Sequence, residues 1–138
     1  MIRLAGALGF LGVALGAFGA HGLRERLAPG MLDVYKTGVL YHLLHAVALF
    51  AVALGADRLA RPRAVAALWA SGIVLFSGSL YALALTGVTV LGAVAPVGGL
   101  LLMAGWLSLS QRRSVNHSVA TPAARSIVTS PTPVKSLR

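Results

Sequence analysis

The feature that most constrains this chain is a run of 48 consecutive residues without a formal charge, from Ala64 to Gln111. A membrane-spanning helix needs about 20 apolar residues to cross a hydrocarbon core about 30 Å thick. One helix over the whole run would be far longer than a single crossing requires. The sequence Thr86-Gly87-Val88-Thr89 is typical of a turn and divides the run. The run therefore predicts two membrane-spanning helices joined by a tight turn.

Two more stretches of 20 residues, 4–23 and 37–56, contain no Asp, Glu, Lys or Arg. The four predicted spans are therefore about 4–22, 37–56, 64–86 and 89–110. Helices are expected because backbone groups in lipid must be satisfied within the segment, and the alternation typical of barrel strands is missing. Only 11% of the residues are charged, against about 25% in soluble domains. The sequence predicts an all-α integral membrane four-helix bundle forming one domain over residues 1–110.

The distribution of basic residues predicts the orientation of the bundle. With the N-terminus inside, nine Lys or Arg residues lie on the cytoplasmic side and three, namely Arg24, Arg26 and Lys36, lie outside. Positive residues near the spans favour the cytoplasm. Trp69 and Trp106 are then expected in an aromatic belt near the cytoplasmic ends of the third and fourth spans, and Tyr35, Tyr41 and Tyr81 in a belt near the outer ends. We therefore expect a multi-pass protein of the cell inner membrane with both termini cytoplasmic. The first span also resembles a signal peptide, but its length and the three later spans favour a retained helix.

Residues 111–138 differ from the rest of the chain, because they are rich in Ser, Thr, Pro and basic residues. Such a segment buries too little apolar surface to fold, so we predict a disordered basic tail. The net charge of +9 is explained by topology, and no nucleic acid is expected as a partner. The chain has no cysteine, which excludes disulfides and thiolate metal sites.

Glycines recur every three or four residues through the first span, at positions 6, 9, 12, 16, 19 and 22. Small residues let membrane helices approach closely. The stripe predicts helix packing, either within the bundle, which we favour, or in a homo-oligomer. In the fourth span Pro96 predicts a kink or a local opening of the helix, because proline lacks a backbone N–H.

Polar side chains gather in the half of the bundle expected to face outward. They include His42 and the candidate site residues His21, Tyr41, His45, Ser77, Ser79 and Tyr81. Three interpretations are open: a hydrogen-bonded layer that fixes helix register, a pocket for a small molecule, or a metal site from His21, His42 and His45. The first is favoured, and no metal is expected as the main interpretation. No catalytic motif is present, so we expect neither an enzyme nor a cofactor.

Several short motifs resemble a known family of small membrane proteins, the domain of unknown function 423, which includes the eukaryotic transmembrane protein 256. The matching segments lie at 16–21 (Gly-Ala-Phe-Gly-Ala-His), 76–81 (Phe-Ser-Gly-Ser-Leu-Tyr) and 96–99 (Pro-Val-Gly-Gly), together with Tyr41, His45-Ala46 and Gly105-Trp106. The resemblance covers about residues 4–110 and implies four spans in a bacterial or mitochondrial membrane. His42 stands where the family pattern leads us to expect glutamine, which weakens a three-histidine metal site. The resemblance implies no activity.

We therefore expect a structural or accessory protein of the membrane, surrounded by the lipid bilayer, with a homo-oligomer or a membrane complex as the possible partner. The alternative is a binder of a small molecule or metal at the polar cluster. A transporter is a lesser alternative, because no span contains an acidic residue and proton or cation pathways usually rely on intramembrane carboxylates.

Overall fold

The structure is a computed structural model that describes residues 1–110. Four of its helices are long and apolar enough to cross a membrane: Ile2–His21, Pro29–Leu54, Pro62–Thr86 and Thr89–Leu109. No strand element occurs among the described residues. This confirms the all-α architecture of four membrane-spanning helices. The predicted tail at 111–138 lies outside the described residues.

The first two long helices are regular, whereas the other two are composite. α1 is Ile2–His21 and α2 is Pro29–Leu54, followed by a short 3₁₀ turn, η1, at Ala56–Arg58. The third long helix consists of α3 (Pro62–Gly72), a π-helical segment η2 (Ile73–Ser77) and α4 (Gly78–Thr86). The fourth begins as a 3₁₀ helix, η3 (Thr89–Ala93), and continues as α5 (Ala95–Leu109).

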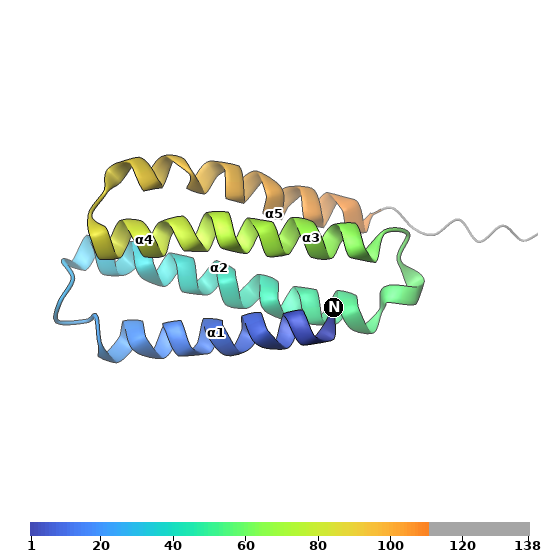
Figure 1. The fold of residues 1–138 in the computed structure, drawn as a ribbon, viewed down its shortest axis with the longest axis horizontal. Helices are drawn as coiled ribbons and strands as arrows, with labels where there is room; N and C mark the ends of the chain where they lie inside the picture. Colours follow the sequence, from blue (N-terminus) through green and yellow to red (C-terminus); the bar gives the residue numbers. More distant parts are fainter. Residues whose placement is uncertain (111–138) are drawn as a thin grey trace, which may run out of the picture.

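The helices lie side by side with alternating direction (Figure 1). α1 packs chiefly on α2, α2 packs on the α3–α4 helix, and α3 packs on α5. α1 is therefore an edge helix, held to the bundle mainly through α2. The N-terminus, the α2–α3 connection and the end of α5 lie together at one end of the bundle (Figure 1).

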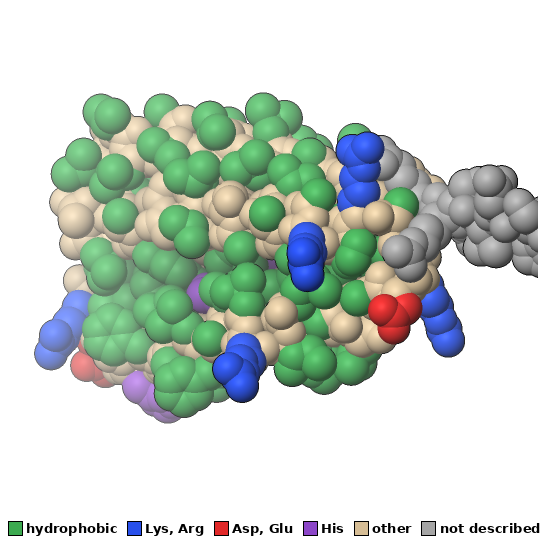
Figure 2. Space-filling model, turned by 45° about the vertical axis from the view of Figure 1, so that its right-hand side comes forward, with side chains coloured by type: hydrophobic (Ala, Val, Ile, Leu, Met, Phe, Trp, Pro, Cys, Tyr) green, Lys and Arg blue, Asp and Glu red, His purple; other side chains and the backbone are tan. Residues whose placement is uncertain are grey.

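The two ends of the bundle differ in net charge. Among the described residues, the end with the N-terminus carries four arginines and one acidic residue: Arg3, Asp57, Arg58, Arg61 and Arg63. The opposite connection carries three basic and two acidic residues. Figure 2 shows hydrophobic side chains covering much of the face in view, and the charged residues among 1–110 all lie near helix ends or in the connections. This distribution is the one that a lipid environment favours.

The helix boundaries follow from the residues that occupy them. Pro29, Pro62 and Pro96 each lie in the first turn of a helix, where the missing N–H costs nothing. Gly87 ends α4 with a φ of 72°, a left-handed conformation that glycine adopts without steric cost. The predicted turn is therefore present. The opening expected at Pro96 is also present, because 3₁₀ geometry replaces the α-helix immediately before it.

The start of α2 differs from the predicted span. The hydropathy pattern predicted a span from residue 37, whereas the helix begins at Pro29. Asp33 and Lys36 interrupt the uncharged run without ending the helix, because a negative charge near a helix N-terminus is favourable and lysine is a good helix former. The middle of α2 therefore lies at His42 and His45.

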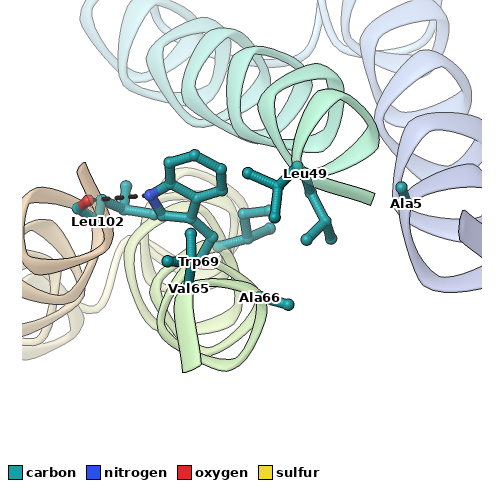
Figure 3. Close-up of a cluster of buried hydrophobic side chains, with 8 residues drawn as sticks. Ala5, Leu49, Val65, Ala66, Trp69 and Leu102 are labelled. Carbon is teal, nitrogen blue, oxygen red and sulfur yellow. Dashed lines mark hydrogen bonds between the residues drawn. The ribbon is translucent and has the colours of Figure 1, made fainter. Parts of the chain in front are cut away.

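The main apolar core surrounds Trp69, which is fully buried. Its indole lies among Leu49, Val65 and Leu102, and its N–H donates to the Leu102 carbonyl at 3.1 Å (Figure 3). Gly105 of α5 lies directly against the indole ring, which leaves no space for a Cβ. This packing holds α3 and α5 close together.

Candidate functional site

The buried polar side chains follow one another along α2, and each one points toward a neighbouring helix. The first is Tyr35, which is fully buried. Its hydroxyl donates to the Leu15 carbonyl of α1 at 2.9 Å. Gly19 makes room for the ring, since a Cβ there would lie 2.6 Å from the Tyr35 Cε1. Tyr35 therefore links α2 to α1 at a position where α1 has no side chain.

His42 lies two turns further along α2 and links it to α4. Its Nδ1 is 3.2 Å from the hydroxyl of Tyr81, and the imidazole is 2% exposed. On its other side the ring lies against Gly12 of α1, where a built Cβ would be 3.4 Å from the His42 Cδ2. The Nε2 atom is buried and has no hydrogen-bond partner among the described residues.

His45 lies near the middle of α2 and links it to α5. Its Nδ1 is 2.8 Å from the Tyr41 carbonyl, and its Nε2 is 3.1 Å from the indole nitrogen of Trp106. A carbonyl only accepts and an indole N–H only donates. We therefore infer a neutral imidazole with the proton on Nδ1 and the lone pair of Nε2 directed at Trp106. Both nitrogens are occupied, so this histidine has no free position for a metal ion.

Aromatic rings surround the His45 imidazole. Trp69 and Trp106 present their rings edge-on, with centroids 5.9 and 6.1 Å from the imidazole centroid. The two indoles are 4.8 Å apart. Such tilted arrangements add packing energy beyond area burial. This cluster of His45, Trp69 and Trp106 joins α2, α3 and α5 at one point.

The two candidate serines differ although they are two residues apart. Ser79 donates to the Phe76 carbonyl at 2.9 Å and is 7% exposed. Ser77 is fully buried, and its Oγ has no partner among the described residues. Ser77 ends the π-helical segment η2, a type of segment that often marks functional positions.

The remaining candidates, His21 and Tyr41, lie apart from this interior. His21 is exposed at the end of α1, whereas Tyr41 is 39% exposed and packs against Phe76, with ring centroids 4.7 Å apart. Among residues 1–110 no three His, Cys, Asp or Glu side chains gather in a way that could hold a metal ion. The described structure thus gives no support to a site formed by His21, His42 and His45.

The structure also changes the expected division of the bundle into a polar outer half and an apolar half with tryptophans. His45 bonds directly to Trp106, which was expected at the opposite end. The reason is twofold: α2 begins earlier than the predicted span, and helical side chains such as Trp106 lean toward the N-terminus of their own helix. Tyr35 and Trp69, expected in aromatic belts, are fully buried.

Sequence reasoning missed Tyr35, Trp69 and Trp106 as partners in the polar cluster. The spacing of Tyr35, His42 and His45 could have indicated such a cluster. Residues seven and three positions apart lie on the same side of a helix, so these three side chains are expected to face the same neighbours. The glycines opposite them, Gly12 and Gly19 in α1 and Gly105 in α5, mark the faces that receive large side chains.

Comparison with known proteins places these observations in a family context. Residues 15–99 match the family described as "Protein of unknown function (DUF423)". The UPF0382 membrane protein YwdK of Bacillus subtilis is 47% identical over 102 residues, covering 72% of this chain and 83% of the relative. The UPF0382 inner membrane protein YgdD of Escherichia coli is 36% identical over 128 residues, covering 85% and 95%. No solved structure matches.

Proposed function

We propose that this chain, which belongs to the DUF423 family of membrane proteins, is a non-enzymatic structural or accessory protein of the membrane. One observation carries the proposal. The buried polar side chains bond one helix to another: Tyr35 to α1, His42 to α4, His45 to α5, and Trp69 to α5. Groups engaged in this way fix the arrangement of the helices and have little capacity left for a substrate.

The location proposed for the bundle is the bacterial inner membrane with both termini in the cytoplasm. The end that carries the N-terminus has the greater positive charge, with Arg3, Arg58, Arg61 and Arg63 against Arg24, Arg26 and Lys36 at the other end. The cytoplasmic side attracts such residues. The similar Escherichia coli protein is named as an inner membrane protein. Reporter fusions after Leu23 and after Leu109 test this topology, and activity on the same side of the membrane would contradict it.

An accessory role requires a partner in the membrane, and the outer faces of the bundle offer three separate surfaces for one. Phe10 on α1, Val74 on η2 and Leu107 on α5 are each well exposed, at 78%, 65% and 73%. Exposed apolar side chains in a membrane protein face either lipid or another helix. A partner would cover one of these surfaces and leave the others in contact with lipid.

The experiment places a photo-crosslinking amino acid at each of these three positions in turn and irradiates native membranes. We expect one position to yield a discrete protein adduct, while the other two, which serve as matched controls, yield only lipid adducts. Mass spectrometry then identifies the adduct as a second copy of this chain or another protein. Lipid adducts alone at all three positions, and at added positions around α1 and α5, would contradict an accessory role.

A second candidate function, the binding of a small molecule, is favoured by one specific observation. The Nε2 of His42 and the Oγ of Ser77 are buried without a partner, and such atoms cost free energy unless something satisfies them. The test is to analyse bound small molecules in protein purified from native membranes, for the wild type, His42→Ala and Ser77→Ala. Loss of a co-purifying compound in either variant would support binding. An identical content in all three would exclude it.

A further inference from the structure

Two adjoining cavities lie beside the α1–α2 pair, at the end where these helices are connected. The first, of about 280 Å³, is a groove between the helices and is lined mainly by apolar residues: Gly16, Gly19, Ala20, Tyr35, Lys36, Val39, Leu40 and Leu43. The second, of about 220 Å³, is lined by Gly19, Ala20, Arg24, Leu32 and Lys36. Gly19, Ala20 and Lys36 line both cavities, so the two lie next to each other.

The two parts differ in chemistry. The groove has the glycines of α1 as one wall, where the absence of side chains leaves it open, and Val39, Leu40 and Leu43 of α2 as the other. Lys36 and Leu43 are seven residues apart, so the groove extends about 10 Å along the helix at 1.5 Å per residue. The adjoining cavity has two cationic side chains, Arg24 and Lys36, on its wall. The two parts together would fit an amphiphile that has an anionic head group and a linear apolar tail.

We propose that this combined cavity binds a membrane phospholipid with a single negative charge, of the phosphatidylglycerol type. The phosphate would lie between Arg24 and Lys36, and one acyl chain would lie in the groove over Gly16 and Gly19. Acyl chains surround a membrane-spanning helix pair, and basic residues at its end attract anionic head groups.

The charged residues nearby determine which lipid head group the cavity favours. Lys36 has an exposed ion pair with Asp33 at 3.5 Å, the two side chains being 61% and 76% exposed. Exposed pairs of this kind are weak, so a phosphate can share the ammonium group. The charged residues at this end, namely Arg24, Glu25, Arg26, Asp33 and Lys36, together carry a net charge of +1, which one phosphodiester balances. A zwitterionic choline lipid would leave this charge uncompensated.

The test is native mass spectrometry of the full chain, released from micelles that contain equal amounts of phosphatidylglycerol and phosphatidylcholine. The wild type should retain phosphatidylglycerol preferentially. Each basic residue near a lipid surface contributes roughly fivefold to binding, so the double variant Arg24→Gln/Lys36→Gln should lose at least fivefold of this preference. The matched control, Arg61→Gln/Arg63→Gln, removes the same charge at the opposite end of the bundle and should retain the preference.

A second variant tests the groove separately from the head-group cavity. Leu40 lines the groove and is 63% exposed, so Leu40→Trp fills the groove without disturbing the core. It should lower the retention of lipid, whereas Leu44→Trp, at an exposed position of α2 outside both cavities, should not. Equal retention of the two lipids by the wild type would overturn the proposal. So would equal losses in the two double variants, or unchanged retention in Leu40→Trp.

Discussion

Replacement of Gly98 by alanine tests a close approach of two helix backbones. Gly98 of α5 faces the backbone of the π-helical segment η2. A Cβ at Gly98 would lie 2.7 Å from the Phe76 Cα and 2.8 Å from the Leu75 carbonyl carbon, and closer still to the Phe76 nitrogen. Ordinary contacts begin at 3.4 Å. Because these atoms belong to the backbone, no rotation of a side chain relieves the overlap, and the two helices must separate.

The size of the effect follows from this separation. Overpacking of a core costs about 1–3 kcal/mol, and a gap of 0.5–1 Å forfeits about a quarter to a half of the dispersion energy of the atoms along it. The alanine recovers up to about 1 kcal/mol of helix propensity. The cost should lie at the upper end of the overpacking range, because backbone atoms cannot rotate away. After the gain in helix propensity we therefore expect Gly98→Ala to lower the free energy of unfolding by about 2 kcal/mol.

The neighbouring Gly99 provides a matched control. Its built Cβ would lie 3.7 Å from the Phe76 Cδ2, an ordinary contact, so Gly99→Ala should leave the free energy of unfolding unchanged or raise it by up to about 1 kcal/mol through helix propensity. Unfolding of both variants in mixed detergent micelles can be followed by the fluorescence of Trp69 and Trp106. If Gly98→Ala were as stable as the wild type, or Gly99→Ala equally destabilised, the close approach of α5 to η2 would be refuted.

Three smaller predictions use the same unfolding assay. Ser77→Ala removes a hydroxyl without a partner and should leave stability unchanged or raised, while Ser79→Ala should lower it by about 0.5–1 kcal/mol; the reverse order would show that Ser77 binds something. Tyr35→Phe removes the bond to the α1 backbone and should cost about 0.6 kcal/mol, and no loss would mean that packing alone holds the ring. Trp106→Phe should cost about 0.6–1.7 kcal/mol and shift the ¹⁵N resonance of the His45 Nε2, and an unmoved resonance would contradict that bond.

Much of the fold could be predicted from the sequence because the lipid environment imposes a simple rule. Length and apolar character decide where a helix can cross, and Gly87 divided the long uncharged run correctly. What hydropathy cannot detect is a helix that continues through charged residues. Asp33 and Lys36 interrupted the apolar pattern but not α2. The prediction therefore placed His42 and His45 near the start of a span, whereas they lie near the middle of α2.

The candidate site could be predicted only in part, for a related reason. A sequence shows which residues are polar, but their partners depend on how the helices face one another. His45 and Trp106 are 61 residues apart, and their contact depends on the rotation of α2 and α5. The favoured interpretation, a hydrogen-bonded layer between helices, agrees with the bonds of Tyr35 and His42 as well.

The pairing of glycines with large side chains explains why Gly12, Gly16 and Gly19 of the α1 stripe pack within the bundle, whereas a Cβ at Gly6 or Gly9 would meet nothing within 4 Å. Two aromatic side chains from the inner helices, Tyr35 and Trp69, lie against glycines of the edge helices. Gly12 and Gly19 of α1 receive the side chains of α2, including Tyr35, just as Gly105 of α5 receives Trp69. Tyr35 and Trp69 each donate a hydrogen bond to a backbone carbonyl across the interface. Because the same arrangement occurs on both sides of the bundle, the outward faces of α1 and α5 are left to lipid or to a partner.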